Sequence, residues 1–194
     1  MTKLLRVAGL LALLSVLGAA SLTPSTAAAP PQPLPFKATI IGATTAMTFA
    51  PGFPFAGSTF GGRCSVPSDW LISFGGTGSA THLGAFTWTS SHCTQIGANP
   101  PATVTISDGR FEYVAANGDI LSESYGDAVV SFPDPGTICM ETHATFTGGT
   151  GRFTEASGSA LERLCFPATS GPWLDEMLIN SSGTIAYDAS DRAG

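Results

Sequence analysis

The segment from Ile138 to Phe166 restricts the possible folds more than any other part of the chain. If Cys139 pairs with Cys165 across an antiparallel hairpin, the numbers of facing residues add up to 304. Glu141 then faces Arg163 on one side of the ribbon as a pair of opposite charges. Side chains alternate between the two faces of a strand, so a slip of one residue would break this pairing. The sequence therefore predicts a disulfide-closed hairpin.

The other face of this hairpin is apolar. In the same register the facing apolar pairs are Ile138 with Phe166, Met140 with Leu164, and Ala144 with Ala160. Thr142 opposite Glu162 is the one polar pair on this side. Because apolar side chains collect on the buried face of a half-solvated sheet, we expect the core on the side away from Glu141.

The remainder of residues 36–190 also alternates between apolar and polar residues, and the spacing of three or four that is typical of helices is missing. We expect one all-β domain, as a sandwich or a barrel, with a helical turn at most at 173–177. Turns are expected at 107–109, 117–119 and 181–183. The expected strands are Phe36–Phe49, Asp69–Phe74, Ala85–Cys93, Ala102–Ser107, Arg110–Ala115, Asp119–Tyr125, Ala128–Phe132, Ile138–Thr147, Gly158–Phe166, Leu174–Asn180 and Gly183–Asp188.

The N-terminal segment has the pattern of an export signal. Lys3 and Arg6 begin it, an uncharged apolar run follows from Val7 to Ala20, and small residues come next. We expect a signal peptide at 1–29 and a Pro-rich linker at 30–35, with a buried helix as the alternative for the apolar run. This run is shorter than the roughly 20 residues of a membrane-spanning helix. The protein is therefore expected to be secreted, extracellular or periplasmic.

The charge of the mature chain excludes some partners. Without residues 1–29 the chain has 6 basic and 14 acidic residues, a net charge of −8. Nucleic acids and anionic membranes are bound by rows of Lys and Arg, which this chain lacks. We expect no nucleic-acid partner and no membrane association of the mature form, and the oligomeric state is not predicted.

The cysteines share a repeated pattern. Four Cys in an exported chain are expected to form two disulfides. Gly-Gly-Thr-Gly occurs once between Cys64 and Cys93 and once between Cys139 and Cys165. This echo predicts the bridges Cys64–Cys93 and Cys139–Cys165, each closing the base of a hairpin-like excursion. The alternative is coincidence in a chain rich in Gly and Thr.

Residues 146–158, Phe-Thr-Gly-Gly-Thr-Gly-Arg-Phe-Thr-Glu-Ala-Ser-Gly, resemble a motif of the allene oxide cyclase and dirigent barrels. There a strand runs into Gly-Gly-Thr-Gly, an aromatic residue follows, and a Gly precedes the next strand. The resemblance implies an antiparallel, eight-stranded closed barrel of the allene oxide cyclase or calycin type, whose lumen holds one small apolar ligand. It carries no catalytic residue of those families onto this chain.

The residues of this motif have a physical role in such a corner. Gly148, Gly149 and Gly151 allow positive φ in a tight turn. Phe153 is expected to plug the end of the barrel, and Gly158 to let the returning strand approach closely.

No complete catalytic set is present in the sequence. It lacks Gly-x-Ser-x-Gly, a phosphate loop, and His residues at zinc spacing, so we expect no cofactor and no metal. Glu141, His143 and Arg163 are the remaining catalytic candidates, because they share one face of the hairpin. Facing a lumen, they could perform acid–base chemistry or orient a ligand carboxylate. Facing solvent, they would form a surface ion pair, which the apolar opposite face favours.

Three functions follow as hypotheses. The leading one is an exported, non-catalytic barrel that binds a small apolar or amphipathic ligand in its lumen. The alternatives are a cofactor-free isomerase or cyclase of the same barrel class, and an extracellular structural or surface protein. A mostly apolar lumen of a few hundred Å³ would favour the first two, and a filled core the third. The aromatic residues that could stack on a ligand, or pack in the core, are Trp70, Trp88, Trp173, Tyr113 and Tyr125.

Overall fold

The computed structural model describes residues 31–49, 63–64, 70–95, 103–169 and 173–188. The predicted signal peptide at 1–29 lies outside these residues, as do residue 30 of the predicted linker and residues 189–190 of the predicted domain. The first strand begins at Leu34, so the last two residues of the predicted linker belong to the sheet. Among the described residues, no helix has the length and apolar character needed to cross a membrane.

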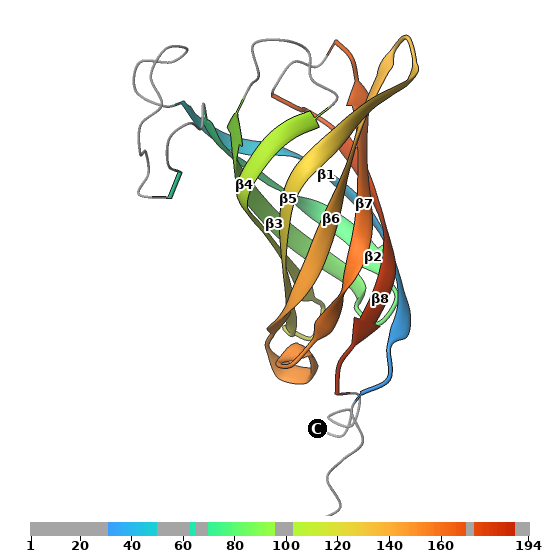
Figure 1. Ribbon diagram of the computed structural model, residues 1–194. Helices are drawn as coiled ribbons and strands as arrows, with labels where there is room; N and C mark the ends of the chain where they lie inside the picture. Colours follow the sequence, from blue (N-terminus) through green and yellow to red (C-terminus); the bar gives the residue numbers. More distant parts are fainter. Residues whose placement is uncertain (1–30, 50–62, 65–69, 96–102, 170–172, 189–194) are drawn as a thin grey trace, which may run out of the picture. The chain divides into compact units, whose positions relative to one another are not determined.

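Eight antiparallel strands form a closed barrel in which each strand pairs with its sequence neighbours and the last pairs with the first (Figure 1). The predicted fold class, an all-β eight-stranded barrel with two disulfides, is confirmed. The elements are β1 (Leu34–Phe49), β2 (Trp70–Ala80), β3 (Gly84–Gln95), β4 (Thr103–Ala115), β5 (Ile120–Asp134), β6 (Thr137–Gly149), the 3₁₀ turn η1 (Gly151–Phe153), β7 (Ser157–Pro167) and β8 (Met177–Ala186). Closure pairs the two edges of the sheet with each other.

Six of the predicted strand segments merge into three long strands, so two predicted turns are wrong. β4 continues through residues 107–109 as an irregularity, because its pairing with β5 is interrupted between Val104 and Gly109 and Asp108 has φ of +51°. β8 continues through 181–183, where a Cβ on Gly183 would lie 2.0 Å from the Ser159 carbonyl oxygen. The polar and Gly residues at these positions thus permit a bulge and a close strand approach.

Other local predictions had mixed outcomes. The turn at 117–119 is confirmed, with Gly118 at φ of +87° between β4 and β5. The helical turn at 173–177 does not form, since residues 173–176 are irregular and Met177 begins β8. The 3₁₀ turn η1 was not predicted, and it lies within the Gly-rich corner.

The predicted register of the hairpin is confirmed. β6 pairs with β7 so that Cys139 faces Cys165 and Glu141 faces Arg163. The predicted apolar pairs also face one another, and both Ala144 and Ala160 are buried inside the barrel. The core therefore lies on the predicted side of the ribbon.

Both predicted disulfides are present, Cys64–Cys93 and Cys139–Cys165. Two such bridges indicate an oxidising environment for the folded protein. The Cys64–Cys93 bridge closes the base of the β2–β3 hairpin as predicted, but the first Gly-Gly-Thr-Gly lies within β2 and not in its turn. A Cβ on Gly76 would lie 2.1 Å from the Ile41 carbonyl oxygen and 2.9 Å from the indole nitrogen of Trp88. This copy therefore makes room for a neighbouring strand and a large side chain.

The second Gly-Gly-Thr-Gly forms the predicted corner. Gly148 and Gly151 have φ of +104° and +55°, and a Cβ on Gly149 would lie 1.8 Å from a backbone oxygen. Phe153 is fully buried in the main core cluster, as expected of a plug. Gly158 has φ of +126°, and its missing Cβ allows β8 to approach β7.

Aromatic rings fill the lumen toward the corner. Phe36 packs edge-on against Phe146, with ring centroids 4.9 Å apart, and Phe86 packs edge-on against Tyr113 at 5.1 Å. These contacts belong to one cluster of buried side chains drawn from all eight strands. The carboxyl groups of Glu123 and Glu162 also lie inside this otherwise apolar interior.

Candidate functional site

The catalytic candidates from the sequence lie on the outer face of the barrel. The Arg163 Nε lies 3.6 Å from the Glu141 Oε1, and both side chains are almost half exposed. His143 is exposed on the same face. The structure brings these three residues together on the surface, where an ion pair contributes at most about 1 kcal/mol. It does not bring them to the lumen.

The lumen contains the polar pair that interrupts the apolar face of the hairpin. Glu162 is 5% exposed and points inward from β7. Thr142, its neighbour on β6, donates a hydrogen bond from its hydroxyl to the Gly126 carbonyl oxygen at 2.9 Å. The mismatch at this position in the predicted register therefore marks a buried carboxyl group.

A second buried carboxyl group lies beside Glu162. Glu123 on β5 is 2% exposed, and neither of its carboxyl oxygens makes a hydrogen bond of acceptable geometry. The Tyr113 hydroxyl donates a hydrogen bond to the Glu162 Oε1 at 3.2 Å. The amino-acid sequence alone did not identify Glu123. Glu123 comes two residues after Leu121, so its side chain lies on the same, apolar side of the strand. We call Glu123 and Glu162 the carboxyl pair.

The carboxyl pair binds protons more tightly than ordinary carboxyl groups. Burial raises the pKa of Glu123 well above its usual value, and the neighbouring Glu162 charge raises it further. Burial also raises the pKa of Glu162, to about 7, against the smaller lowering effect of its hydrogen bonds. Two like charges in an apolar interior are unfavourable, so the pair retains at least one proton near neutral pH.

A neutral hydrogen-bonded group is formed by inward side chains of β3 and β5. The Tyr125 hydroxyl contacts the Ser90 Oγ at 2.7 Å and the His92 Nδ1 at 2.8 Å. Burial, together with the positive charge of Arg63, lowers the pKa of His92 to about 3, so its imidazole is neutral at physiological pH. Burial also raises the pKa of Tyr125, which keeps its phenol protonated.

Most of these groups line a cavity within the barrel, although Glu123 and Tyr113 do not. Its empty volume is about 470 Å³ including its open side, and about 60 Å³ of this can hold the centre of a water molecule. Nine of the lining residues are apolar, and the polar ones are Ser90, His92, Tyr125, Thr142 and Glu162. A mostly apolar cavity with a few converging polar groups is the usual form of a small-molecule site.

The predicted stacking aromatics divide between cavity and core. Trp88 and Tyr125 line the cavity, and Trp88 stacks on Phe111 with ring centroids 4.7 Å apart. Tyr113 is fully buried, and Trp70 is also buried. Trp173 is 47% exposed and lies outside the cavity lining.

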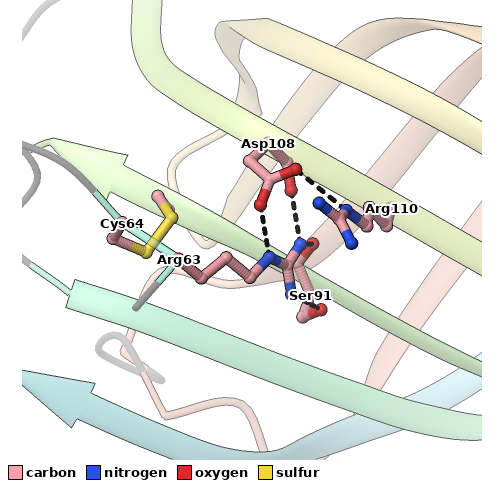
Figure 2. Close-up of a disulfide and its surroundings, with 6 residues drawn as sticks. Arg63, Cys64, Ser91, Asp108 and Arg110 are labelled. Atoms are coloured by element: carbon pink, nitrogen blue, oxygen red, sulfur yellow. Dashed lines mark hydrogen bonds and ion pairs between the residues drawn. A yellow bond between two sulfur atoms is a disulfide. The ribbon is translucent and has the colours of Figure 1, made fainter. Parts of the chain in front are cut away.

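A charged cluster on the outer face holds the strands around this site. Figure 2 shows Arg63, next to the disulfide of Cys64, reaching Asp108 and Ser91, while Arg110 binds Asp108 from the other side. Burial alone would raise the pKa of Asp108, but hydrogen bonds from both guanidinium groups outweigh it and lower the pKa below its ordinary value. The cluster thus fastens the irregular part of β4 to β3.

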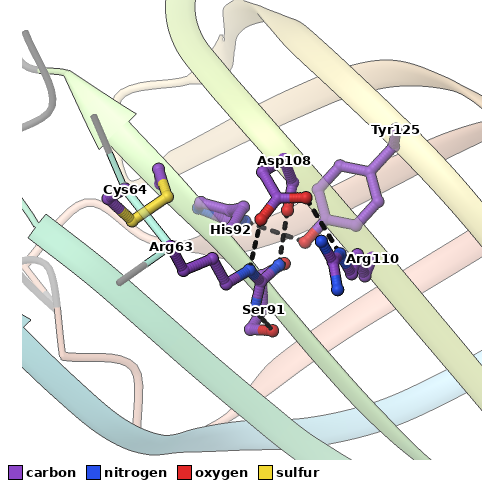
Figure 3. Close-up of polar contacts among 8 residues, drawn as sticks. Arg63, Cys64, Ser91, His92, Asp108, Arg110 and Tyr125 are labelled. Atoms are coloured by element: carbon purple, nitrogen blue, oxygen red, sulfur yellow. Dashed lines mark hydrogen bonds and ion pairs between the residues drawn. A yellow bond between two sulfur atoms is a disulfide. The ribbon is translucent and has the colours of Figure 1, made fainter. Parts of the chain in front are cut away.

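This outer cluster and the cavity wall share strand β3. Ser91 and His92 are consecutive, so their side chains point to opposite faces of the strand. Arg63 binds Ser91 outside, whereas His92 binds Tyr125 inside (Figure 3). In the part of the chain that the structure describes, no group of three or more His, Cys, Asp or Glu residues could hold a metal ion.

Comparisons with known proteins found no relatives. No protein-family model matches the chain. No curated protein matches it. No solved structure matches it. The resemblance of residues 146–158 to the allene oxide cyclase and dirigent barrels therefore stays a prediction.

Proposed function

We propose that the protein is an exported, non-catalytic barrel that binds a small apolar or amphipathic molecule in its lumen. The observation that carries this proposal is the cavity, whose walls are mostly apolar and whose polar groups converge on one space. The part of the cavity that can hold the centre of a water molecule, about 60 Å³, is room for a few water molecules, so a larger ligand must extend through the open side or displace side chains. The two disulfides and the basic, then apolar N-terminal segment support export.

Native mass spectrometry of the protein purified from its host medium tests the proposal. We expect a co-purifying small molecule, or saturable binding of the uncharged fluorophore N-phenylnaphthylamine to the ligand-free chain. Ala128 lines the cavity and is 1% exposed, so Ala128→Leu should fill part of it and weaken binding. Ala85→Leu, at an exposed position of β3, is the matched control. If no molecule co-purifies and the fluorophore does not bind the ligand-free chain, the proposal is contradicted.

A cofactor-free isomerase or cyclase is the second candidate, and the carboxyl pair is the observation that favours it. Glu162 lines the cavity, and a carboxyl group with a pKa near 7 can both take up and release a proton at neutral pH. If the protein performs proton transfer on a ligand, a co-purifying molecule should exchange a carbon-bound hydrogen for deuterium when incubated with the protein in D₂O. A ligand that is recovered unchanged would favour the binder.

The third hypothesis, an extracellular structural or surface protein, requires a filled core. The mostly apolar lining of the cavity favours a binder, whereas its small space of about 60 Å³ for water centres and the aromatic cluster that fills the rest of the lumen favour this hypothesis. Loss of binding in both assays described above would make this hypothesis the best remaining one.

A further inference from the structure

We propose that the ligand carries a cationic group, an ammonium on an apolar body, and that this group binds the carboxyl pair of Glu123 and Glu162. The inference rests on the proposed function, because it assigns a ligand chemistry to the same cavity. Glu162 brings the carboxyl pair to the cavity wall, and Tyr113 holds one of its oxygens in place.

No cation of the described residues neutralises the carboxyl pair. The Lys and Arg residues in the described part of the chain are Lys37, Arg63, Arg110, Arg152 and Arg163. Both Arg63 and Arg110 bind Asp108, and the other two arginines bind Asp119 and Glu141. Lys37 is exposed. The described residues therefore supply no positive charge to the carboxyl pair when it ionises, and a bound cationic ligand can supply one.

Unpartnered polar atoms surround the carboxyl pair. Ser181 faces Glu162 across β7 and β8, and its hydroxyl is buried without a hydrogen-bond partner among the described residues. Both carboxyl oxygens of Glu123 are also buried without a hydrogen-bond partner among the described residues. Buried polar groups in folded proteins nearly always have partners, and once the carboxyl pair gives up its proton, the donors beside it are the Tyr113 and Ser181 hydroxyls alone among the groups named here. An ammonium group has three N–H donors and no acceptor, which matches this set.

The cavity walls favour a cation over an anion. Trp88, Phe111 and Phe74 line the cavity, and the faces of aromatic rings attract cations. His92 adds no positive charge, because its imidazole is neutral at physiological pH. A carboxylate ligand would meet the negative charge of the carboxyl pair, and a neutral alcohol would gain only a hydrogen bond.

Binding of a cation should release the proton that the carboxyl pair holds. The described titratable groups around the pair are Tyr113, Tyr125 and His92, and burial keeps all three neutral near pH 7. With a pKa of about 7, Glu162 becomes roughly tenfold more ionised between about pH 6 and pH 8. The affinity for an alkylammonium should therefore rise about tenfold over this range. The affinity for the corresponding alcohol should stay constant.

Three probes that share one alkyl chain test the inference on the full chain. Hexylammonium, hexanol and hexanoate are compared by their displacement of N-phenylnaphthylamine. We expect hexylammonium to bind about tenfold or more tightly than hexanol, and hexanoate to bind most weakly. Glu162→Gln should abolish the preference for the ammonium, whereas Glu141→Gln on the outer face should keep it.

The outcomes separate this inference from the proposed function. If the fluorophore and hexanol bind but hexylammonium binds no better than hexanol, or if Glu162→Gln keeps the preference, the inference is overturned and the proposed function stands. If none of the probes binds, the proposed function fails and the inference with it. Should Glu162→Gln fail to fold, the wild-type chain decides, because an unchanged hexylammonium affinity between about pH 6 and pH 8 overturns the inference.

Discussion

Replacing Glu162 with glutamine removes one of two carboxyl groups that are buried without a compensating cation among the described residues. We expect the variant to be more stable than the wild type at about pH 8 and similar to it at about pH 4.5. Glutamine has nearly the same shape as a protonated glutamic acid, and it cannot ionise. The comparison therefore isolates the cost of placing a negative charge in the lumen.

The size and sign of the effect follow from the raised pKa of Glu162. Because the native state binds this proton more tightly than the unfolded state, the stabilisation is fully present below the unfolded pKa of 4.5. It is lost as the pH rises through the native pKa of about 7. A pKa unit corresponds to about 1.4 kcal/mol, so the wild type should lose about 3 kcal/mol relative to Glu162→Gln.

Urea unfolding followed by Trp fluorescence, with disulfides intact and in buffers free of amines, measures this difference from about pH 4.5 to pH 8. Amine buffers are avoided because an ammonium in the lumen would stabilise the wild type. Glu141→Gln is the control, since this half-exposed carboxylate should change stability by less than about 1 kcal/mol. A wild type that is more stable than Glu162→Gln at about pH 8, or a difference that does not vary with pH, would refute the reasoning.

Other substitutions test the fold. Gly76→Ala should destabilise by about 1–3 kcal/mol in thermal unfolding, because its Cβ meets backbone atoms, whereas Gly126→Ala has open space and should be nearly neutral. Removing the Cys139–Cys165 bridge with the double Ala variant should cost about 3 kcal/mol in chemical denaturation, and an unchanged midpoint would contradict the loop-entropy estimate. Tyr125→Phe should cost about 1–3 kcal/mol in the same assay, because it leaves a buried serine and imidazole without their shared partner. No loss in that variant would mean that another group replaces the phenol.

The amino-acid sequence alone determined the local geometry of one hairpin. The pairing of Cys139 with Cys165, the outer ion pair and the inward apolar residues all followed from the two-residue period of a strand. The Gly-rich corner was equally predictable, because only glycine tolerates its positive φ without strain. These features depend on neighbours in sequence or on a single register.

At other positions the local sequence did not distinguish a turn from a continuing strand. Ser, Asp and Gly at 107–109, and Ser and Gly at 181–183, are typical of turns, yet both segments lie within long strands. The same residue types also occur at β-bulges and at positions where two strands approach closely. Whether such a segment turns depends on the strands beside it, and these are distant in sequence. The first Gly-Gly-Thr-Gly lies within a strand for the same reason.

Only the tertiary structure decided where the polar groups meet. Closure of the barrel places Glu123 and Glu162, which are far apart in sequence, beside each other and beside Tyr113. The sequence marked Glu162 as an exception to the apolar pattern, but it marked neither Glu123 nor the meeting of the two carboxyl groups. Burial raises both pKa values, and the neighbouring Glu162 charge raises that of Glu123 further; exclusion of water and this proximity are properties of the closed lumen and not of either strand.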